Sequence, residues 1–181
     1  MGSKKKHFFK LCFFIALPVI ASGIVLWREV KTLPPNDVIA VDVPLAEPTN
    51  TKLTLRDSIV NFGKTLLGTP YIYGACNEDG FDCSGFVYYV FRHFQIEVPR
   101  SSRQFKDFGE EVLIDNVQKG DILVFLGPTS TTIGHVGIVS NPKGKESDFI
   151  HASSGRSMKV IISSLKQDQY AQRFVKAVRA F

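Results

Sequence analysis

The chain has 181 residues, which is enough for one domain with a hydrophobic core and a tail. Its formal net charge of +5 comes from 22 Lys and Arg against 17 Asp and Glu. Lys4, Lys5, Lys6 and Lys10 precede the first acidic residue, Glu29, and the remainder has 18 basic against 17 acidic residues. The excess charge therefore belongs to the N-terminal arm and gives no support for a nucleic-acid partner.

An uncharged, apolar stretch over residues 11–27 follows these lysines. With the two phenylalanines before it, the stretch is about as long as a bilayer-spanning helix, and the lysines place the N-terminus inside. We therefore predict a transmembrane anchor within residues 1–28 and an extracytoplasmic remainder. Two alternatives stay open: a signal peptide cleaved near Ala21 and Gly23, and a buried core helix.

Four prolines fall in residues 29–52, which disfavours a regular helix and predicts an extended linker. Residues 53–181 are predicted to form the folded domain. Thr54 and Asp57 have the spacing of a helix capping box, and apolar residues at helical spacing continue to Gly68. A second helix is predicted from Cys83, because an apolar stripe of helical period follows it, formed by Phe86, Val87, Val90, Phe91 and Phe94.

The second half of the chain changes to short runs rich in Val, Ile and Phe, separated by Gly, Pro, Ser and Asn. Such runs are typical of strands. Helices first and strands later predict an α+β domain with helices packed on a mostly antiparallel sheet. The predicted strands are 122–126, 135–140, 148–151, 159–162 and 174–181.

Cys83 lies where a loop passes into the second helix, directly after the good N-cap residue Asp82. Unpaired amides and the helix dipole favour an anion at this position, so we expect the Cys83 thiolate to form easily. The alternative is a buried cysteine that acts as a small hydrophobic residue. The position therefore makes Cys83 a candidate nucleophile.

A cysteine nucleophile needs a base and a polar group that orients the base. His93 is on the same helix as Cys83 and nearly three turns away, which excludes it. His135 and His151 lie on predicted strands, and we expect His135 to act as the base and His151 as its orienting partner. Taken alone, a histidine on a strand is more often structural than catalytic, so the assignment depends on all three residues together.

Cys76 keeps two other interpretations open. Together with Cys83, His135 and His151 it supplies the residue types of a zinc site, although the spacing of the cysteines is unusual. A disulfide between Cys76 and Cys83 is also possible in an oxidising compartment, and it would block the nucleophile.

Six segments in order resemble the signatures of the NlpC/P60 family of cell-wall cysteine peptidases, over about residues 54–181. The resemblance implies a papain-like α+β core, the triad Cys83, His135 and His151, and no metal or organic cofactor. It also implies hydrolysis of peptidoglycan stem peptides, usually between γ-D-glutamyl and a diamino acid. The segments are Leu67–Gly74, Phe81–Phe86, Val98–Ser102, Lys119–Ile122, Gly134–Ile138 and Phe149–Ala152.

The same resemblance implies that Tyr71, Asp82 and Ser84 bind the free amino group of an L-alanine at the start of the stem, with Tyr71 also a possible oxyanion donor. Ala75 and Tyr73 depart from the family pattern and leave the shape of the specificity pocket open. An amidase or acyltransferase on the same fold, or a catalytically silent wall-binding module, remains an alternative. The sequence gives no indication of the oligomeric state.

The anchor prediction has a direct test. Cell fractionation should recover the chain in the cytoplasmic membrane with residues 53–181 exposed on the outer side, because the charged arm holds the N-terminus inside. A mature protein that begins near Ile24 in the soluble envelope fraction would contradict the anchor and support a cleaved signal peptide.

Overall fold

The computed structural model describes residues 53–181. The predicted anchor at 1–28 and linker at 29–52 lie outside the described residues. Within the part that the structure describes, no helix has both the length and the apolar character needed to cross a membrane.

Helix α1 (Leu55–Thr65) begins with the predicted capping box. The Thr54 hydroxyl accepts from the backbone N–H of Asp57 at 3.1 Å, and the Asp57 carboxylate accepts from the Thr54 backbone N–H at 3.3 Å. Ile59 and Val60 face the core. The chain then turns at Gly68, whose φ of 91° is favourable only for glycine.

Eight strands and two further helices follow α1, and the five strands expected from the sequence are all present. The sequence analysis did not foresee the small hairpin β1–β2, the short strand β3, the two 3₁₀ turns or the one-turn helix α3. In chain order the elements are β1 (Cys76–Asn77), β2 (Gly80–Phe81), α2 (Cys83–His93), η1 (Ser102–Lys106), β3 (Glu110–Val112), η2 (Ile114–Asn116), β4 (Ile122–Leu126), β5 (Ile133–Asn141), β6 (Asp148–Ser153), β7 (Lys159–Ser164), α3 (Asp168–Ala171) and β8 (Phe174–Arg179).

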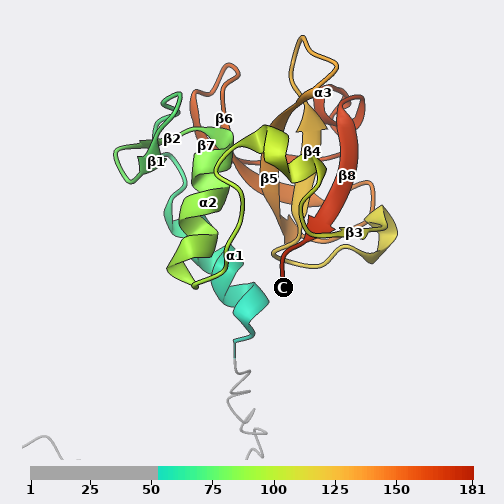
Figure 1. The fold of residues 1–181 in the computed structure, drawn as a ribbon, viewed down its shortest axis with the longest axis horizontal. Coiled ribbons are helices and arrows are strands. Elements are labelled where there is room, and N and C mark those ends of the chain that lie inside the picture. Colours follow the sequence, from blue (N-terminus) through green and yellow to red (C-terminus); the bar gives the residue numbers. More distant parts are fainter. Residues whose placement is uncertain (1–52) are drawn as a thin grey trace, which may run out of the picture. The chain divides into compact units, whose positions relative to one another are not determined.

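Six of the strands form one sheet in the order β3-β8-β4-β5-β6-β7, and all its neighbouring pairs are antiparallel. The prediction of an α+β domain with an antiparallel sheet is therefore confirmed. Helices α1 and α2 lie together on one side of this sheet (Figure 1).

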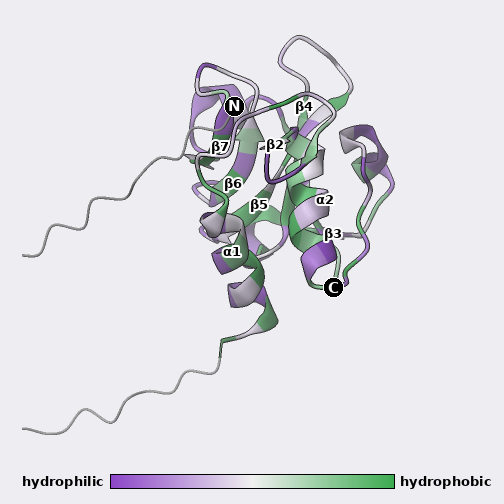
Figure 2. Ribbon diagram, turned by 90° about the vertical axis from the view of Figure 1, so that its left-hand side faces the viewer, coloured by the Kyte–Doolittle hydropathy of each residue, from purple (hydrophilic) through white to green (hydrophobic). Residues whose placement is uncertain are grey.

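The central strand β4 shows how the sheet builds a core on both faces. Ile122 and Val124 belong to the cluster shared with α1 and α2, whereas Leu123 and Phe125 belong to a second cluster that includes Tyr170. Successive side chains of a strand point to opposite faces, so a continuous apolar run is what a strand covered on both faces requires. Hydrophobic residues accordingly run along α2, β5 and β6 in Figure 2.

A buried carboxylate links strand β8 to helix α1. Asp121 is fully buried at the start of β4, where Arg56 of α1 and Arg179 of β8 pair with it at 3.1 and 2.7 Å. Because two cations and the backbone N–H of Gln118 satisfy the carboxylate, its burial is tolerated. This cluster is structural and lies on elements that support the sheet, apart from the chemistry described next.

Candidate active site

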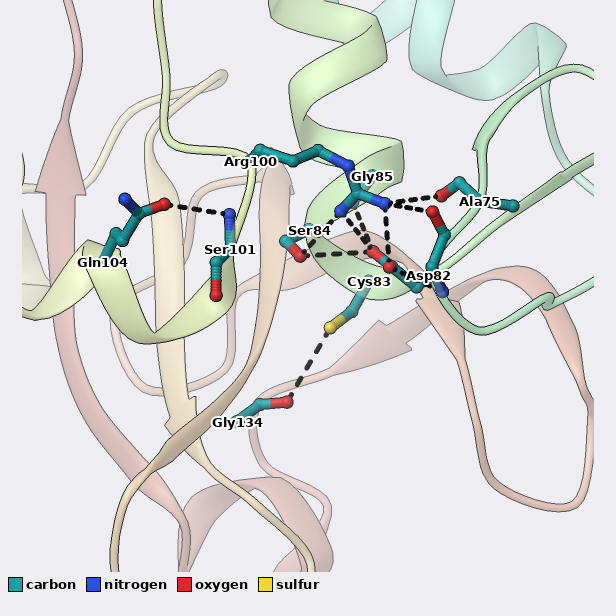
Figure 3. Close-up of polar contacts among 10 residues, drawn as sticks. Ala75, Asp82, Cys83, Ser84, Gly85, Arg100, Ser101, Gln104 and Gly134 are labelled. Carbon is teal, nitrogen blue, oxygen red and sulfur yellow. Dashed lines mark hydrogen bonds and ion pairs between the residues drawn. The ribbon is translucent and has the colours of Figure 1, made fainter.

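The N-terminus of α2 points its cysteine at strand β5. Asp82 is the N-cap, and its Oδ1 accepts from the backbone N–H of Gly85 at 2.6 Å, which starts the helix at Cys83. The Cys83 thiol donates to the carbonyl oxygen of Gly134 at 3.7 Å (Figure 3). The sulfur therefore lies against the strand one residue before His135.

Gly85 allows a loop to pack against the first turn of this helix. A Cβ at Gly85 would collide with the carbonyl oxygen of Ala75 and come within 3.1 Å of Asp82 Oδ1. The loop that carries Tyr71 and Ala75 can therefore approach α2 closely only because residue 85 has no side chain. In Figure 3 Ala75 lies beside Asp82, and both face the guanidinium of Arg100.

The Asp82 carboxylate accepts hydrogen bonds from several groups. Besides the Gly85 N–H it accepts from the Ser84 hydroxyl at 3.1 Å, from the Gly74 N–H at 3.0 Å and from two nitrogens of Arg100 at 3.0 Å each. This bidentate pair raises the pKa of Arg100. Arg100 lies in the segment Val98–Ser102, but its role is not predictable from the sequence, because nothing in the sequence shows that it reaches Asp82.

Tyr71 belongs to the same neighbourhood. Its side chain is partly buried, and burial raises its pKa, with further contributions from the negative charges that Cys83 and Asp82 can carry. Tyr71, Asp82 and Ser84 thus surround the cysteine, as the sequence-based hypothesis of a binding site requires. Their part in binding a substrate stays a prediction.

The two candidate histidines lie in direct contact. His135 Nε2 on β5 is 2.9 Å from His151 Nδ1 on β6, and both rings are buried. Gly137 makes this approach possible, because a Cβ there would collide with the ring of Phe149 and lie 3.1 Å from the Cβ of His151. On its other side, His151 Nε2 lies 3.0 Å from the Ser163 hydroxyl and 3.3 Å from the Tyr170 hydroxyl.

This chain of contacts links the tautomers of the two rings. A neutral imidazole has one N–H donor and one acceptor nitrogen. If His135 donates from Nε2 to His151 Nδ1, His151 must carry its hydrogen on Nε2 and donate it to Ser163 or Tyr170. In that arrangement Nδ1 of His135 is an unprotonated base. Sequence reasoning did not find Ser163 and Tyr170, which lie in β7 and α3 and contain no recognisable motif.

Burial keeps the whole group neutral. It lowers the pKa of His135 to about 3, with the positive charge of Arg173 adding to the effect, and it lowers the pKa of His151 well below the usual range. Burial also raises the pKa of the Cys83 thiol to about 11, and the Asp82 carboxylate acts in the same direction. The site at rest thus combines a thiol with neutral imidazoles.

The prediction that the helix start makes Cys83 a ready thiolate is therefore wrong for this structure. Backbone N–H groups of Val136, Ser84 and Cys83 do favour the thiolate, as expected. The loss of solvation outweighs them, because the sulfur is packed between α2 and β5.

The alternatives that involve Cys76 receive no support from the structure. Cys76 and Cys83 are both free thiols, so the disulfide is absent. Among residues 53–181 no three His, Cys, Asp or Glu side chains are grouped as metal ligands would be. His93 stacks on Phe62 with ring centroids 3.9 Å apart, away from the cysteine.

The sequence profile described as the NlpC/P60 family matches residues 68–179, which cover α2 and the whole six-stranded sheet. The chain belongs to the NlpC/P60 family. In this NlpC/P60 chain the matched segment contains every residue of the candidate site. The match also includes Arg100, Ser163 and Tyr170, whose contacts only the structure reveals.

Three known proteins illustrate the relationship. The γ-DL-glutamyl hydrolase of Bacillus subtilis is 38% identical over 125 residues, which are 68% of this chain and 29% of the relative. The Escherichia coli murein DD-endopeptidase MepS/murein LD-carboxypeptidase is 36% identical over 113 residues, 62% of this chain and 56% of the relative. A solved NlpC/P60 family protein from Bacillus cereus superposes with a TM-score of 0.62 at 29% identity, over 70% of this chain and 40% of that chain. The chain thus spans well under two thirds of each of them.

The neutral histidines predict a specific acid sensitivity. Because the folded-state pKa of His135 and His151 is lowered, their contribution to stability is complete above about pH 6.5 and is lost as the pH falls through the folded-state pKa of each, which is about 3 for His135. Between these values the unfolded chain binds protons that the folded chain does not. The test is chemical denaturation of the wild type and His151→Gln at several pH values. A plot of the unfolding free energy against pH should have a smaller slope for His151→Gln, by ~1.4 kcal/mol per pH unit, because the variant lacks one proton-binding group in the unfolded chain.

His93→Gln is the matched control, because it removes an exposed imidazole outside the site. Equal slopes for the wild type and His151→Gln would show that His151 accepts a proton in the folded state.

Proposed function

We propose that this chain is a cysteine peptidase that hydrolyses the stem peptides of peptidoglycan, with Cys83 as nucleophile, His135 as general base and His151 as the residue that orients the base. The observation that carries the proposal is the buried contact between His135 and His151, on the strand against which the Cys83 thiol lies. A thiol at a helix start with an oriented imidazole nearby is the arrangement that nucleophilic catalysis needs.

The reaction starts from neutral groups. As the Cys83 sulfur forms a bond to the substrate carbonyl carbon, the thiol proton passes to His135, whose Nδ1 is the available nitrogen because Nε2 contacts His151. His135 then returns this proton to the leaving amine as the C–N bond breaks. Water, deprotonated by His135, attacks the thioester and releases the acid and the free thiol. His151 holds the ring in one tautomer throughout.

The negative oxygen of the intermediate needs donors. The first backbone N–H groups of α2 have no partner within the helix and point toward the cysteine end, where the helix dipole also favours negative charge. The Tyr71 hydroxyl, on the loop beside Cys83, is proposed as an additional donor. Both are fixed by packing before the substrate arrives.

The bond that we propose for cleavage is the one between γ-D-glutamyl and a diamino acid. The name of the Bacillus subtilis relative supports a γ-glutamyl bond, whereas the name of the Escherichia coli relative refers to DD and LD bonds of murein. Such a substrate lies outside the cytoplasm, which agrees with the proposed anchor at residues 1–28.

Cys83→Ala should abolish hydrolysis, by a factor of about a thousand or more, and leave the fold intact, since it removes the nucleophile and little volume. The measurement is incubation of the full-length protein with purified peptidoglycan and mass spectrometry of the released peptides.

Cys76→Ala is the matched control and should retain hydrolysis, because this thiol is on strand β1 and not at the start of α2, where the proposed nucleophile lies. Transfer products instead of hydrolysis products would indicate an acyltransferase, released glycan-free stems an amidase, and binding without any product a silent wall-binding module. Loss of turnover in a folded Cys76→Ala protein would contradict the assignment of a single nucleophile.

The amino end of the stem is the proposed recognition element on the acyl side. The hydroxyl oxygens of Tyr71 and Ser84 can accept hydrogen bonds from a free ammonium group, and Asp82 supplies negative charge that Arg100 partly offsets. Peptides that begin with free L-Ala-γ-D-Glu should therefore have a higher kcat/KM than the same peptides after N-acetylation, on the order of tenfold.

Tyr71→Phe should reduce this preference. It is a better variant than Asp82→Asn, which would also break the pair with Arg100 and disturb the start of α2. Equal kcat/KM for free and acetylated peptides would contradict amine recognition and point to stems that are still attached to glycan.

A further inference from the structure

A cleft of about 990 Å³ opens beside the two histidines, and no residue of α2 lines it. Its lining includes Gly134, His135 and His151, the loop after β6, and the segment around α3. Two arginines, Arg156 and Arg173, line the cleft, and no Asp or Glu does. The cleft is therefore a positively charged space that is continuous with the candidate catalytic residues.

Arg173 differs from the other buried or half-buried arginines of the described chain. Arg56, Arg100 and Arg179 each pair with an aspartate. Arg173 is held by carbonyl oxygens instead, with Nε 2.6 Å from that of Gln169 and Nη1 3.0 Å from that of Leu126. Within residues 53–181 no carboxylate forms an ion pair with it.

The remaining nitrogen of Arg173 is available to a ligand. Nη2 donates to no group of residues 53–181, and it is not a buried unsatisfied atom. The guanidinium lies over the Tyr170 ring at 5.5 Å, and its charge contributes to the lowered pKa of His135 and His151. A half-buried cation fixed by two carbonyl groups, with its outer edge free, has the form of an anion-binding group.

The direction of the reaction decides which half of a substrate would enter this cleft. The general acid must lie within hydrogen-bond distance of the leaving nitrogen, so the leaving fragment is next to His135. Asp82 and Ser84 flank Cys83 at the start of α2, where the acyl fragment is proposed to bind, and neither of them lines the cleft. The leaving fragment therefore extends past His135 into the cleft that Arg173 lines.

We propose that Arg173, with the exposed Arg156 of the loop after β6, forms a subsite for a carboxylate of the leaving fragment. The inference rests on the proposed function and specifies its substrate class: a diamino acid fragment that carries a free carboxylate. Two sources fit this chemistry, a carboxylate at the end of the diamino acid side chain, as in diaminopimelate, and the main-chain carboxylate at the C-terminus of a tripeptide.

The test compares four peptides with the full-length protein: L-Ala-γ-D-Glu followed by diaminopimelate or by L-lysine, each with a free or an amidated C-terminus. The wild type should prefer a carboxylate at one of the two positions by on the order of tenfold in kcat/KM, mostly through KM. Preference for diaminopimelate over lysine identifies the side-chain carboxylate, and preference for acid over amide identifies the main-chain carboxylate.

In Arg173→Gln the ratio of kcat/KM values for peptides with and without the carboxylate should fall close to one. In Arg156→Gln the same ratio should fall less. Arg92→Gln is the matched control, because it removes the same charge from the exposed face of α2 and should keep the wild-type preference. Arg173→Lys distinguishes a binding role from a folding role. Lysine keeps the positive charge but lacks the planar N–H donors of the guanidinium, so a folded Arg173→Lys protein should show part of the preference that Arg173→Gln loses.

A wild-type protein that cleaves all four peptides equally would overturn the subsite and leave the proposed function standing. An unchanged preference in Arg173→Gln would overturn it as well. If the wild type cleaves none of the peptides, the proposed function fails, and calorimetric binding of the same peptides to Cys83→Ala still decides whether a carboxylate is recognised.

Discussion

The Asp82 carboxylate is the interaction on which the geometry of the site depends. It joins three parts of the chain: the loop at Gly74, the first turn of α2 and the guanidinium of Arg100. Each donor restrains one segment, and together they fix the direction in which Cys83 leaves the helix. A single cap would start the helix, but it would not hold the neighbouring loop and Arg100 in place.

Burial also affects the site, because it sets the protonation of Cys83 and of the two histidines. Cys83 and both histidines are withdrawn from water by the packing of α2 on β5 and β6, and each therefore takes its neutral form. The proton therefore moves from Cys83 to His135 only when a bound substrate presents its carbonyl carbon to the sulfur. The positive charge of Arg173 also favours the neutral imidazoles, because a nearby cation opposes their protonation.

Much of this arrangement can be predicted from the sequence, and the exceptions have a common cause. Alternation and composition locate the five main strands, and local patterns locate the caps at Thr54 and Asp82, since both depend on neighbours in the chain. The partners Arg100, Ser163 and Tyr170 depend on contacts between distant segments, and so does the desolvation that reverses the expected acidity of Cys83. Short elements such as β1, β3 and α3 lack a periodic signal long enough to recognise.

The two cysteines differ in a way that matters for chemical probes. Cys76 is partly exposed on a hairpin, whereas Cys83 is enclosed and keeps its proton at neutral pH. A small alkylating reagent reacts with thiolate that it can reach, so labelling reports first on Cys76. A covalent inhibitor of this protein must therefore bind as a substrate does before its electrophile can react with the sulfur, and its selectivity then derives from the cleft beside His135 and His151.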